Sequence, residues 1–192
     1  MKAYHIINTE IKDLPFIYSL FEEAISYQKR KGYPVWVGYD KEVLKREIEN
    51  KQQYKIVIDD AIACIFSICY SDEIIWRERE NGESLYLHRI AVNPFYKGQK
   101  HFGKILNWCV GYAIENALLN IRMDTWADNP DLVNYYKNSG FQIVGTLTTP
   151  DSEKLPIPQR NNRVVLLEFT IDNNSLIRDE TGSGIYTAPG EN

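Results

Sequence analysis

A chain of 192 residues with 44% hydrophobic and 25% charged residues has the composition of an ordinary globular protein, built most simply as one domain, with two small domains as the alternative. Its net charge of −4 argues against a dedicated nucleic-acid binder. No apolar run approaches the roughly 18 residues that span a bilayer, so we expect neither a nucleic-acid nor a membrane partner.

The cysteines and the first residues indicate a cytoplasmic protein. Residues 1–10 lack the long apolar stretch of a signal peptide. The three cysteines, Cys64, Cys69 and Cys109, lie in apolar stretches without metal-ligand spacing, which suits a reducing compartment better than a disulfide framework. The three histidines are scattered as well, so we expect no metal.

The first part of the chain reads as a strand followed by two helices. Residues 2–8 form the strand. Residues 12–31 carry apolar side chains at helical spacing, and Gly32 ends that run. Asp40 is placed to cap a second helix, 41–50.

A hairpin and a polar segment come next. Residues 53–59 and 61–70 are two β-rich runs with Asp59 and Asp60 between them, which predicts a tight antiparallel hairpin. Residues 71–83 are polar and include the charged run RERE. We expect a loop or extended edge there, with its charges solvated.

The second half alternates strands and helices. We predict strands at 84–92 and 120–126, a helix at 102–118, a helix at 130–138 capped by Asp128 or Asn129, and strands at 141–147 and 163–171 around a proline-rich loop. The last twenty or so residues have few apolar groups and predict a flexible or surface-lying tail. The order β-α-α-β-β-β-α-β-α-β-β predicts a mixed α/β fold rather than a doubly wound sheet.

The segment LYLHRIAVNPFYKGQKHFG, residues 85–103, is typical of a phosphate site. A buried strand leads into a basic glycine loop and then a helix N-terminus, where backbone N–H groups and the helix dipole favour an anion. Lys97 and Lys100 add positive charge, and Gly98 allows close approach of the backbone. The segment therefore predicts a phosphate-bearing ligand.

Two segments together, LHRIAVNP with its following glycines (87–103) and MDTWADNPDLVNYYKNSGF (123–141), resemble the GNAT superfamily of acyl-CoA-dependent N-acyltransferases. The resemblance includes Ile75-Trp76 and is closest to bacterial members with YLHRIAV and YYKNSGF motifs. It implies a GNAT domain over residues 1–170 with a tail at 171–192. Its fold would be a mostly antiparallel mixed sheet of about six to seven strands, flanked by about four helices, with splayed central strands.

The resemblance also implies acetyl-CoA as acyl donor and no metal. The central strand would bind pantetheine through its backbone, the following loop would bind the pyrophosphate, and one asparagine would lie near the pantetheine or cap its helix. The residues implied are Ile90, Ala91, Val92, Lys97, Gly98, Gln99, Lys100, His101, Phe102, Gly103 and Asn129.

The loop can be aligned with the family pattern, Arg/Gln-x-x-Gly-x-Gly/Ala, in two registers. An anchor on Lys97-Gly98 puts Lys100 and Phe102 where the family has glycines. An anchor on Gly103 puts His101 at the first glycine and keeps the helix in phase, so we favour it. A positive φ at His101 would then cost on the order of 1 kcal/mol, unless the loop is one residue longer.

Acyl transfer from a thioester to an amine needs a neutral amine, a polarised carbonyl and a proton for the leaving thiolate. By resemblance Tyr136 is the acid, and Tyr135 points about 100° away on the helix toward packing or a cleft wall. Asp124 matches a carboxylate base of the ribosomal-protein N-terminal acetyltransferases, or is an aspartate hydrogen-bonded within the sheet. The other candidate bases are His88, Glu83 and Glu73.

Other side chains allow two roles. Arg89, inside a strand, pairs with a carboxylate such as Asp124 or lines the cleft. Trp36, Trp76 and Trp126 either shape an acceptor pocket or pack in the core.

The sequence thus predicts an N-acetyltransferase that acts on a primary amine of a small molecule or peptide by direct attack, as a monomer or homodimer. The alternative is a weakly catalytic or non-catalytic acyl-CoA sensor with the same fold. The acceptor would be read by the loops at 26–40, 71–83 and 148–162.

Overall fold

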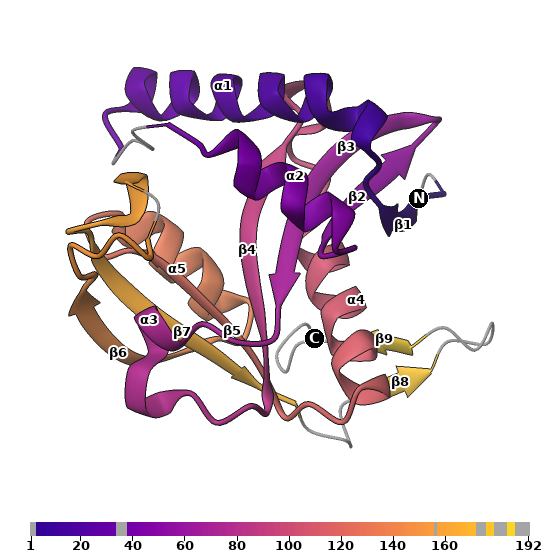
Figure 1. Cartoon of the computed structure of the whole chain (residues 1–192). Coiled ribbons are helices and arrows are strands. Elements are labelled where there is room, and N and C mark those ends of the chain that lie inside the picture. The colour runs from indigo at the N-terminus through magenta and orange to yellow at the C-terminus, as the bar shows by residue number, and fades with distance from the viewer. Residues whose placement is uncertain (1–2, 34–37, 156, 172–175, 179–183, 187–192) are drawn as a thin grey trace. The chain divides into compact units, whose positions relative to one another are not determined.

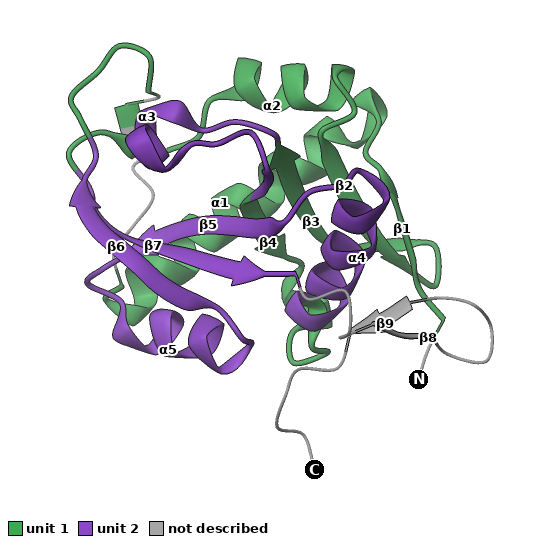
Figure 2. Cartoon of the chain, turned by 90° about the horizontal axis from the view of Figure 1, so that it is seen from below, with its two compact units in different colours: residues 1–69, 87–101, 150–161 green, residues 70–86, 102–149, 162–192 purple. Residues whose placement is uncertain are grey.

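The computed structural model describes residues 3–33, 38–155, 157–171, 176–178 and 184–186 (Figure 1). The chain divides into two compact units that interleave along the sequence (Figure 2). Unit 1 comprises residues 1–69, 87–101 and 150–161, and unit 2 comprises residues 70–86, 102–149 and 162–192. Among the described residues, no helix combines the length and apolarity that a bilayer crossing requires.

Unit 1 is built on antiparallel strands β1 (His5–Asn8), β2 (Gln53–Ile58) and β3 (Ala61–Cys69), in that order, and on the second half of β4 (Ser84–Val92). The β2–β3 hairpin confirms the predicted turn. Asp59 and Asp60 have φ of 49° and 62°, and two positive φ values define the type I′ turn that matches the twist of paired strands.

Two helices supply the core of unit 1: α1 (Leu14–Lys31) and α2 (Lys41–Glu49). Gly32 ends α1 in the left-handed conformation at φ 67°, which costs glycine no Cβ clash. The Asp40 side chain caps α2 by accepting from the backbone N–H groups of Glu42 and Val43. The buried cluster consists of Ile17, Leu20, Phe21, Leu44, Ile48, Ile65 and Ala91.

Unit 2 contains the first half of β4, followed in the sheet by β5 (Asn120–Trp126), β7 (Arg163–Thr170) and β6 (Gln142–Thr148). Strand β4 pairs with β5 in parallel over Ser84–Tyr86, and the other two pairings are antiparallel. The β5–β7 register is continuous, whereas β6 has a register shift between Ile143 and Gly145.

The helices of unit 2 are α3 (Glu73–Trp76), α4 (His101–Glu115, whose first residue is in unit 1) and α5 (Pro130–Asn138). Helix α4 buries Ile105, Leu106 and Cys109 as predicted, and burial raises the pKa of the Cys109 thiol. It ends earlier than predicted, because Ala117 has a φ of 56° that is incompatible with a right-handed helix.

The structure confirms the mixed α/β class: its described residues form a seven-stranded mixed sheet accompanied by five α-helices. The sequence missed the four-residue α3 and two short antiparallel strands in the predicted tail, β8 (Leu176–Arg178) and β9 (Gly184–Tyr186). The single domain over 1–170 and the splay of the central strands stay predictions.

A buried arginine organises the polar interior of unit 2. Arg122 is 6% exposed, and its Nε donates to Glu168 Oε2 at 2.7 Å. Its Nη1 donates to the carbonyl of Arg79 at 2.7 Å and to the Tyr86 hydroxyl at 3.0 Å. The guanidinium also lies over the indole of Trp76, 4.6 Å from the ring centroid.

A second charged group, the Glu80 carboxylate, holds the backbone of the segment before β4 through hydrogen bonds. The Glu80 carboxylate accepts backbone N–H bonds from Asp72 at 2.9 Å and from Asn81 and Gly82 at 3.1 Å each. These bonds help to hold the pKa of Glu80 below its usual value, although burial opposes them. The expected solvated face is confirmed for residues 77–79, which are exposed, whereas Glu80 is half-buried.

We predict that Arg122→Met lowers the free energy of unfolding by about 3–5 kcal/mol, because it leaves the Glu168 carboxylate without its cation partner. Denaturant titration measures this change. Arg163→Met on the neighbouring strand is the matched control: Arg163 is exposed, its nearest carboxylate oxygen on Asp128 is 3.8 Å away, and the expected loss is below about 1 kcal/mol. Equal losses in the two variants would contradict the role of Arg122.

Candidate functional site

The loop between β4 and α4 is fixed by hydrogen bonds at its start, and its last residues are exposed to solvent. Asn93 accepts from the N–H of Phe95 at 3.1 Å and donates to the carbonyl of Ile62 at 2.9 Å, which fixes the turn after β4. Residues 97–100 are all exposed. Their backbone N–H groups precede the N-terminus of the 15-residue α4, which is the arrangement that binds anions.

The backbone of this loop differs from the expectation for His101. The positive φ values fall at Gly98 (76°) and Lys100 (51°), and His101 is the first residue of α4. Its Nε2 lies 2.7 Å from the carbonyl oxygen of Tyr96 and donates to it, since a carbonyl only accepts. The cost of a positive φ in a residue with a Cβ therefore falls on Lys100, and the His101 ring connects the start of α4 to the loop.

The remaining residues of the loop have distinct environments. The Lys97 ammonium lies 3.7 Å from the ring centroid of Tyr27 on α1, so a cation–π contact holds it. Gly103 lies inside α4, and a Cβ there would meet nothing within 4 Å. Phe102 is buried at 6% exposure and packs rather than faces solvent.

The central strand has an irregularity where pantetheine binding is predicted. Arg89 has a φ of 53°, rare for a residue with a Cβ. Its guanidinium pairs with Glu47 on α2 at 2.6 Å, so the structure supplies the expected carboxylate from α2. Ala91 is buried in the core of unit 1, whereas Ile90 and Val92 are half-buried.

His88 is a poor candidate for the base. Desolvation and the charge of Arg89 lower the pKa of its imidazole to about 3. A base with so low a pKa removes protons weakly near neutral pH. The other two candidate bases, the carboxylates of Glu73 and Glu83, are exposed. Glu83 accepts a hydrogen bond from the Asn81 side chain at 3.0 Å.

Helix α5 places the two neighbouring tyrosines in different environments, as its periodicity predicts. Tyr136 is 8% exposed and its ring lies 4.9 Å from that of Phe102 and 6.4 Å from that of Phe141. Tyr135 is 47% exposed. The structure therefore brings the candidate acid against the first turn of α4. Asn129 caps α5 by accepting from the N–H of Leu132 at 3.2 Å, so its cap role is confirmed.

Asp124 is half-buried on β5, two residues from Arg122. Because side chains alternate along a strand and the β5–β7 register is continuous, Arg122, Asp124 and Trp126 share one face of the sheet. On that face Asp124 is directly opposite Leu166 of β7.

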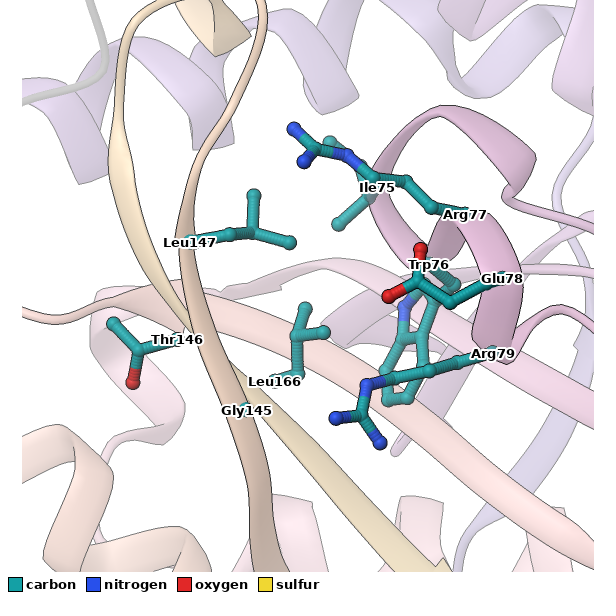
Figure 3. A pocket seen from close by; sticks show the side chains of 9 residues that line it. All are labelled: Ile75, Trp76, Arg77, Glu78, Arg79, Gly145, Thr146, Leu147 and Leu166. Carbon is teal, nitrogen blue, oxygen red and sulfur yellow. The ribbon is translucent and has the colours of Figure 1, made fainter.

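A pocket of about 210 Å³ lies beside this position in unit 2 (Figure 3). Its floor comes from β6 and β7 and includes Leu166, the partner of Asp124, while α3 and the following 3-10 turn (Arg77–Arg79) form its wall. The polar run 71–83 was the sequence signal for an acceptor loop, but the short α3 gave no periodicity from which to predict the wall. The lining residues are Ile75, Trp76, Arg77, Glu78, Arg79, Gly145, Thr146, Leu147 and Leu166.

The candidate residues fall into one group in each unit. Unit 1 holds residues 90–92 and 97–101, and unit 2 holds Phe102, Gly103, Asp124, Asn129 and Tyr136. Trp76 is buried at 1% exposure, and Trp126 is half-buried. Trp36 lies outside the described residues.

Comparisons with known proteins agree on one family. The model of the acetyltransferase (GNAT) family matches residues 17–141. The uncharacterized N-acetyltransferase YesJ of Bacillus subtilis (strain 168) is 24% identical over 164 residues, covering 76% of this chain and 91% of YesJ.

Solved structures share the fold. A GNAT-family acetyltransferase from Listeria monocytogenes 4b F2365 has a TM-score of 0.71 at 20% identity, covering 87% of this chain and 94% of its own. The ribosomal-protein-S18-alanine N-acetyltransferase of Escherichia coli has a TM-score of 0.62 at 13% identity, covering 88% and 95%. With its mixed sheet and its match to the family model over residues 17–141, the chain belongs to the GNAT family of acetyltransferases and is an acyltransferase.

Proposed function

We propose that the protein transfers an acetyl group from acetyl-CoA to a primary amine by direct attack. The observation that carries this proposal is the exposed loop at 97–100, with positive φ at Gly98 and Lys100, leading into the N-terminus of α4. Such a turn presents backbone N–H groups and the positive helix end to a pyrophosphate. Membership of the GNAT family supports acetyl-CoA as the donor.

The proposed reaction uses two side chains. Asp124, directly or through water, removes the proton from the attacking ammonium, and the neutral amine adds to the thioester carbonyl. Backbone N–H groups of β4, at Ile90 and Val92, stabilise the oxyanion, and they also bind the pantetheine arm. Tyr136 donates its proton to the leaving CoA thiolate as the C–S bond breaks, and the positively charged nitrogen of the adduct loses a proton that restores the tyrosine hydroxyl, which gives amide and free thiol.

The cellular setting we propose is a reducing cytoplasm, without nucleic-acid or membrane partners and without a metal. The three cysteines are in the thiol form, which fits such a compartment. A monomer or a homodimer is compatible with this function.

A second candidate, an acyl-CoA sensor with little catalysis, is favoured by the loop itself. In one register Lys100 and Phe102 stand where family loops have glycine, and in the other His101 does. Lys97 already contacts Tyr27. Incubation with acetyl-CoA and a panel of amines, with detection of free thiol, separates the two functions. Thiol release that depends on the amine supports the enzyme, and tight acetyl-CoA binding without release supports the sensor.

Tyr136→Phe removes the proposed proton donor but keeps the ring that packs on Phe102. We expect kcat to fall by about 10²–10⁴-fold while the affinity for acetyl-CoA stays nearly unchanged. Tyr135→Phe is the matched control, because the neighbouring tyrosine is exposed, and it should keep wild-type kcat. Wild-type turnover in Tyr136→Phe would remove the assignment.

Asp124→Asn tests the base through the pH dependence of kcat/KM. A carboxylate base is active when ionised, so wild-type activity should fall as the pH drops through its pKa, and this acid limb should be lost in the variant. With its pKa at about 3, His88 contributes no limb near pH 6.5. An unchanged acid limb in Asp124→Asn would exclude Asp124 as the base.

Gly98→Ala tests the loop. A Cβ at Gly98 meets no atom within 4 Å, so the cost comes from the φ of 76° alone and should be about 1–2 kcal/mol. We expect acetyl-CoA binding, measured by calorimetry, to weaken about five- to thirtyfold if the loop must keep this conformation. Gly111→Ala, inside α4 with equally open space, is the control and should bind as wild type. Equal affinity in the two variants would contradict this role of the loop.

A further inference from the structure

The pocket in unit 2 contains a buried hydrogen-bond donor that the proposed chemistry does not use. Trp76 is 1% exposed, and its Nε1 makes no hydrogen bond within the described part of the chain. Figure 3 shows this nitrogen on the edge of the indole that borders the pocket. Native proteins pair nearly all such buried donors, so an unpaired one beside a pocket indicates a missing acceptor.

Two arginines extend this set of donors at the mouth of the pocket. Arg77 donates to the carbonyl of Thr148 at 3.3 Å through one nitrogen, which leaves its other donors available. The Arg79 guanidinium makes no hydrogen bond or ion pair with any described residue, although the carbonyl of Arg79 accepts from Arg122. The backbone of the wall is therefore fixed while the charged ends remain open to a ligand.

Gly145 gives the Arg79 side chain its position. A Cβ at Gly145 would lie 3.7 Å from Nε and 3.8 Å from Nη2 of Arg79 and 3.5 Å from Leu166. The side chain thus rests against bare backbone of β6, next to the register shift at Ile143. In Figure 3 its guanidinium extends toward β6 on the floor of the pocket.

The charges that line the pocket indicate the chemistry of its ligand. Two guanidinium groups and an indole N–H are donors suited to a carboxylate, which a guanidinium binds with two parallel bonds. Glu78 is the single acid among the lining residues and is exposed. These charges complement a zwitterionic ligand: the two guanidiniums suit its carboxylate, and the Glu78 carboxylate suits its cationic amine.

The pocket is also placed for the proposed reaction. Its floor residue Leu166 is directly opposite Asp124, and Gly145 of β6 is the next partner of Leu166 across the sheet. Two strand spacings, about 10 Å, therefore separate the Arg79 side of the pocket from the proposed base. An amino acid with a distal amine, such as lysine, spans this distance when its extended side chain and the hydrogen bonds at its two ends, about 3 Å each, are counted together.

We propose that this pocket is the acceptor's carboxylate subsite, so that the amine substrate also carries a carboxylate bound by Arg79 and the Trp76 N–H, with Arg77 at the rim. The proposal rests on the acetyltransferase function proposed above. It predicts discrimination between an amino acid and the amine obtained by removing its carboxylate.

The test measures thiol release from acetyl-CoA with matched acceptors: lysine against cadaverine, and phenylalanine against phenethylamine. For at least one pair we expect kcat/KM to favour the amino acid by tenfold or more. Arg79→Met should abolish that preference through a higher KM for the amino acid, with the rate on the decarboxylated amine unchanged. Arg79→Lys should restore part of it, and Arg46→Met, which removes an exposed arginine of α2, should leave it intact.

Each outcome bears on a different proposal. Equal or faster transfer to the decarboxylated amines in every pair, or a preference that survives Arg79→Met, would overturn the carboxylate subsite and leave the acetyltransferase function standing. An absence of thiol release with every amine would overturn the proposed function and, with it, this inference. A melting temperature of Arg79→Met equal to that of the wild type shows that a lost preference is not a loss of folding.

Discussion

The buried guanidinium of Arg122 bonds Glu168, Tyr86 and the carbonyl of Arg79, and so joins β5 to β7, to β4 and to the loop before β4. A buried guanidinium is stable only if its donors are paired, so the loop before β4 must follow a path that brings the Arg79 carbonyl to it. That path puts the 3-10 turn at Arg77–Arg79 beside β6 and β7 and creates the pocket. The hydrogen bond from Arg122 to the Arg79 carbonyl thereby helps to set the shape of the pocket.

A contact between aromatic rings connects the proposed cofactor-binding helix with the proposed proton donor. Phe102 occupies the first turn of α4, directly after the loop at 97–100, and its ring packs on Tyr136 of α5. The candidate proton donor is thus held by the helix whose N-terminus would hold the cofactor's pyrophosphate. Rigid aromatic packing fits this task, because an acid must stay within hydrogen-bond reach of the leaving thiolate.

Local signals in the sequence were sufficient for most of the fold. The Asp40 cap, the Gly32 terminus and the Asp59–Asp60 turn each specify their geometry through the residues involved, and all three are confirmed. The four residues of α3 are too short for periodicity, and the partners of Arg122 are 36 to 46 residues away, so neither could be predicted. The residue with positive φ could not be identified from the sequence either: it is Lys100, whereas His101 begins α4 and its ring bonds the Tyr96 carbonyl.

We propose that the loop at 97–103 and the start of α4 bind the pyrophosphate of acetyl-CoA. A crystal structure with bound acetyl-CoA would show where the pyrophosphate lies. We expect pyrophosphate oxygens about 3 Å from backbone nitrogens of residues 98–103, with the thioester sulfur within reach of the Tyr136 hydroxyl. A pyrophosphate bound elsewhere, with this loop unoccupied, would contradict it.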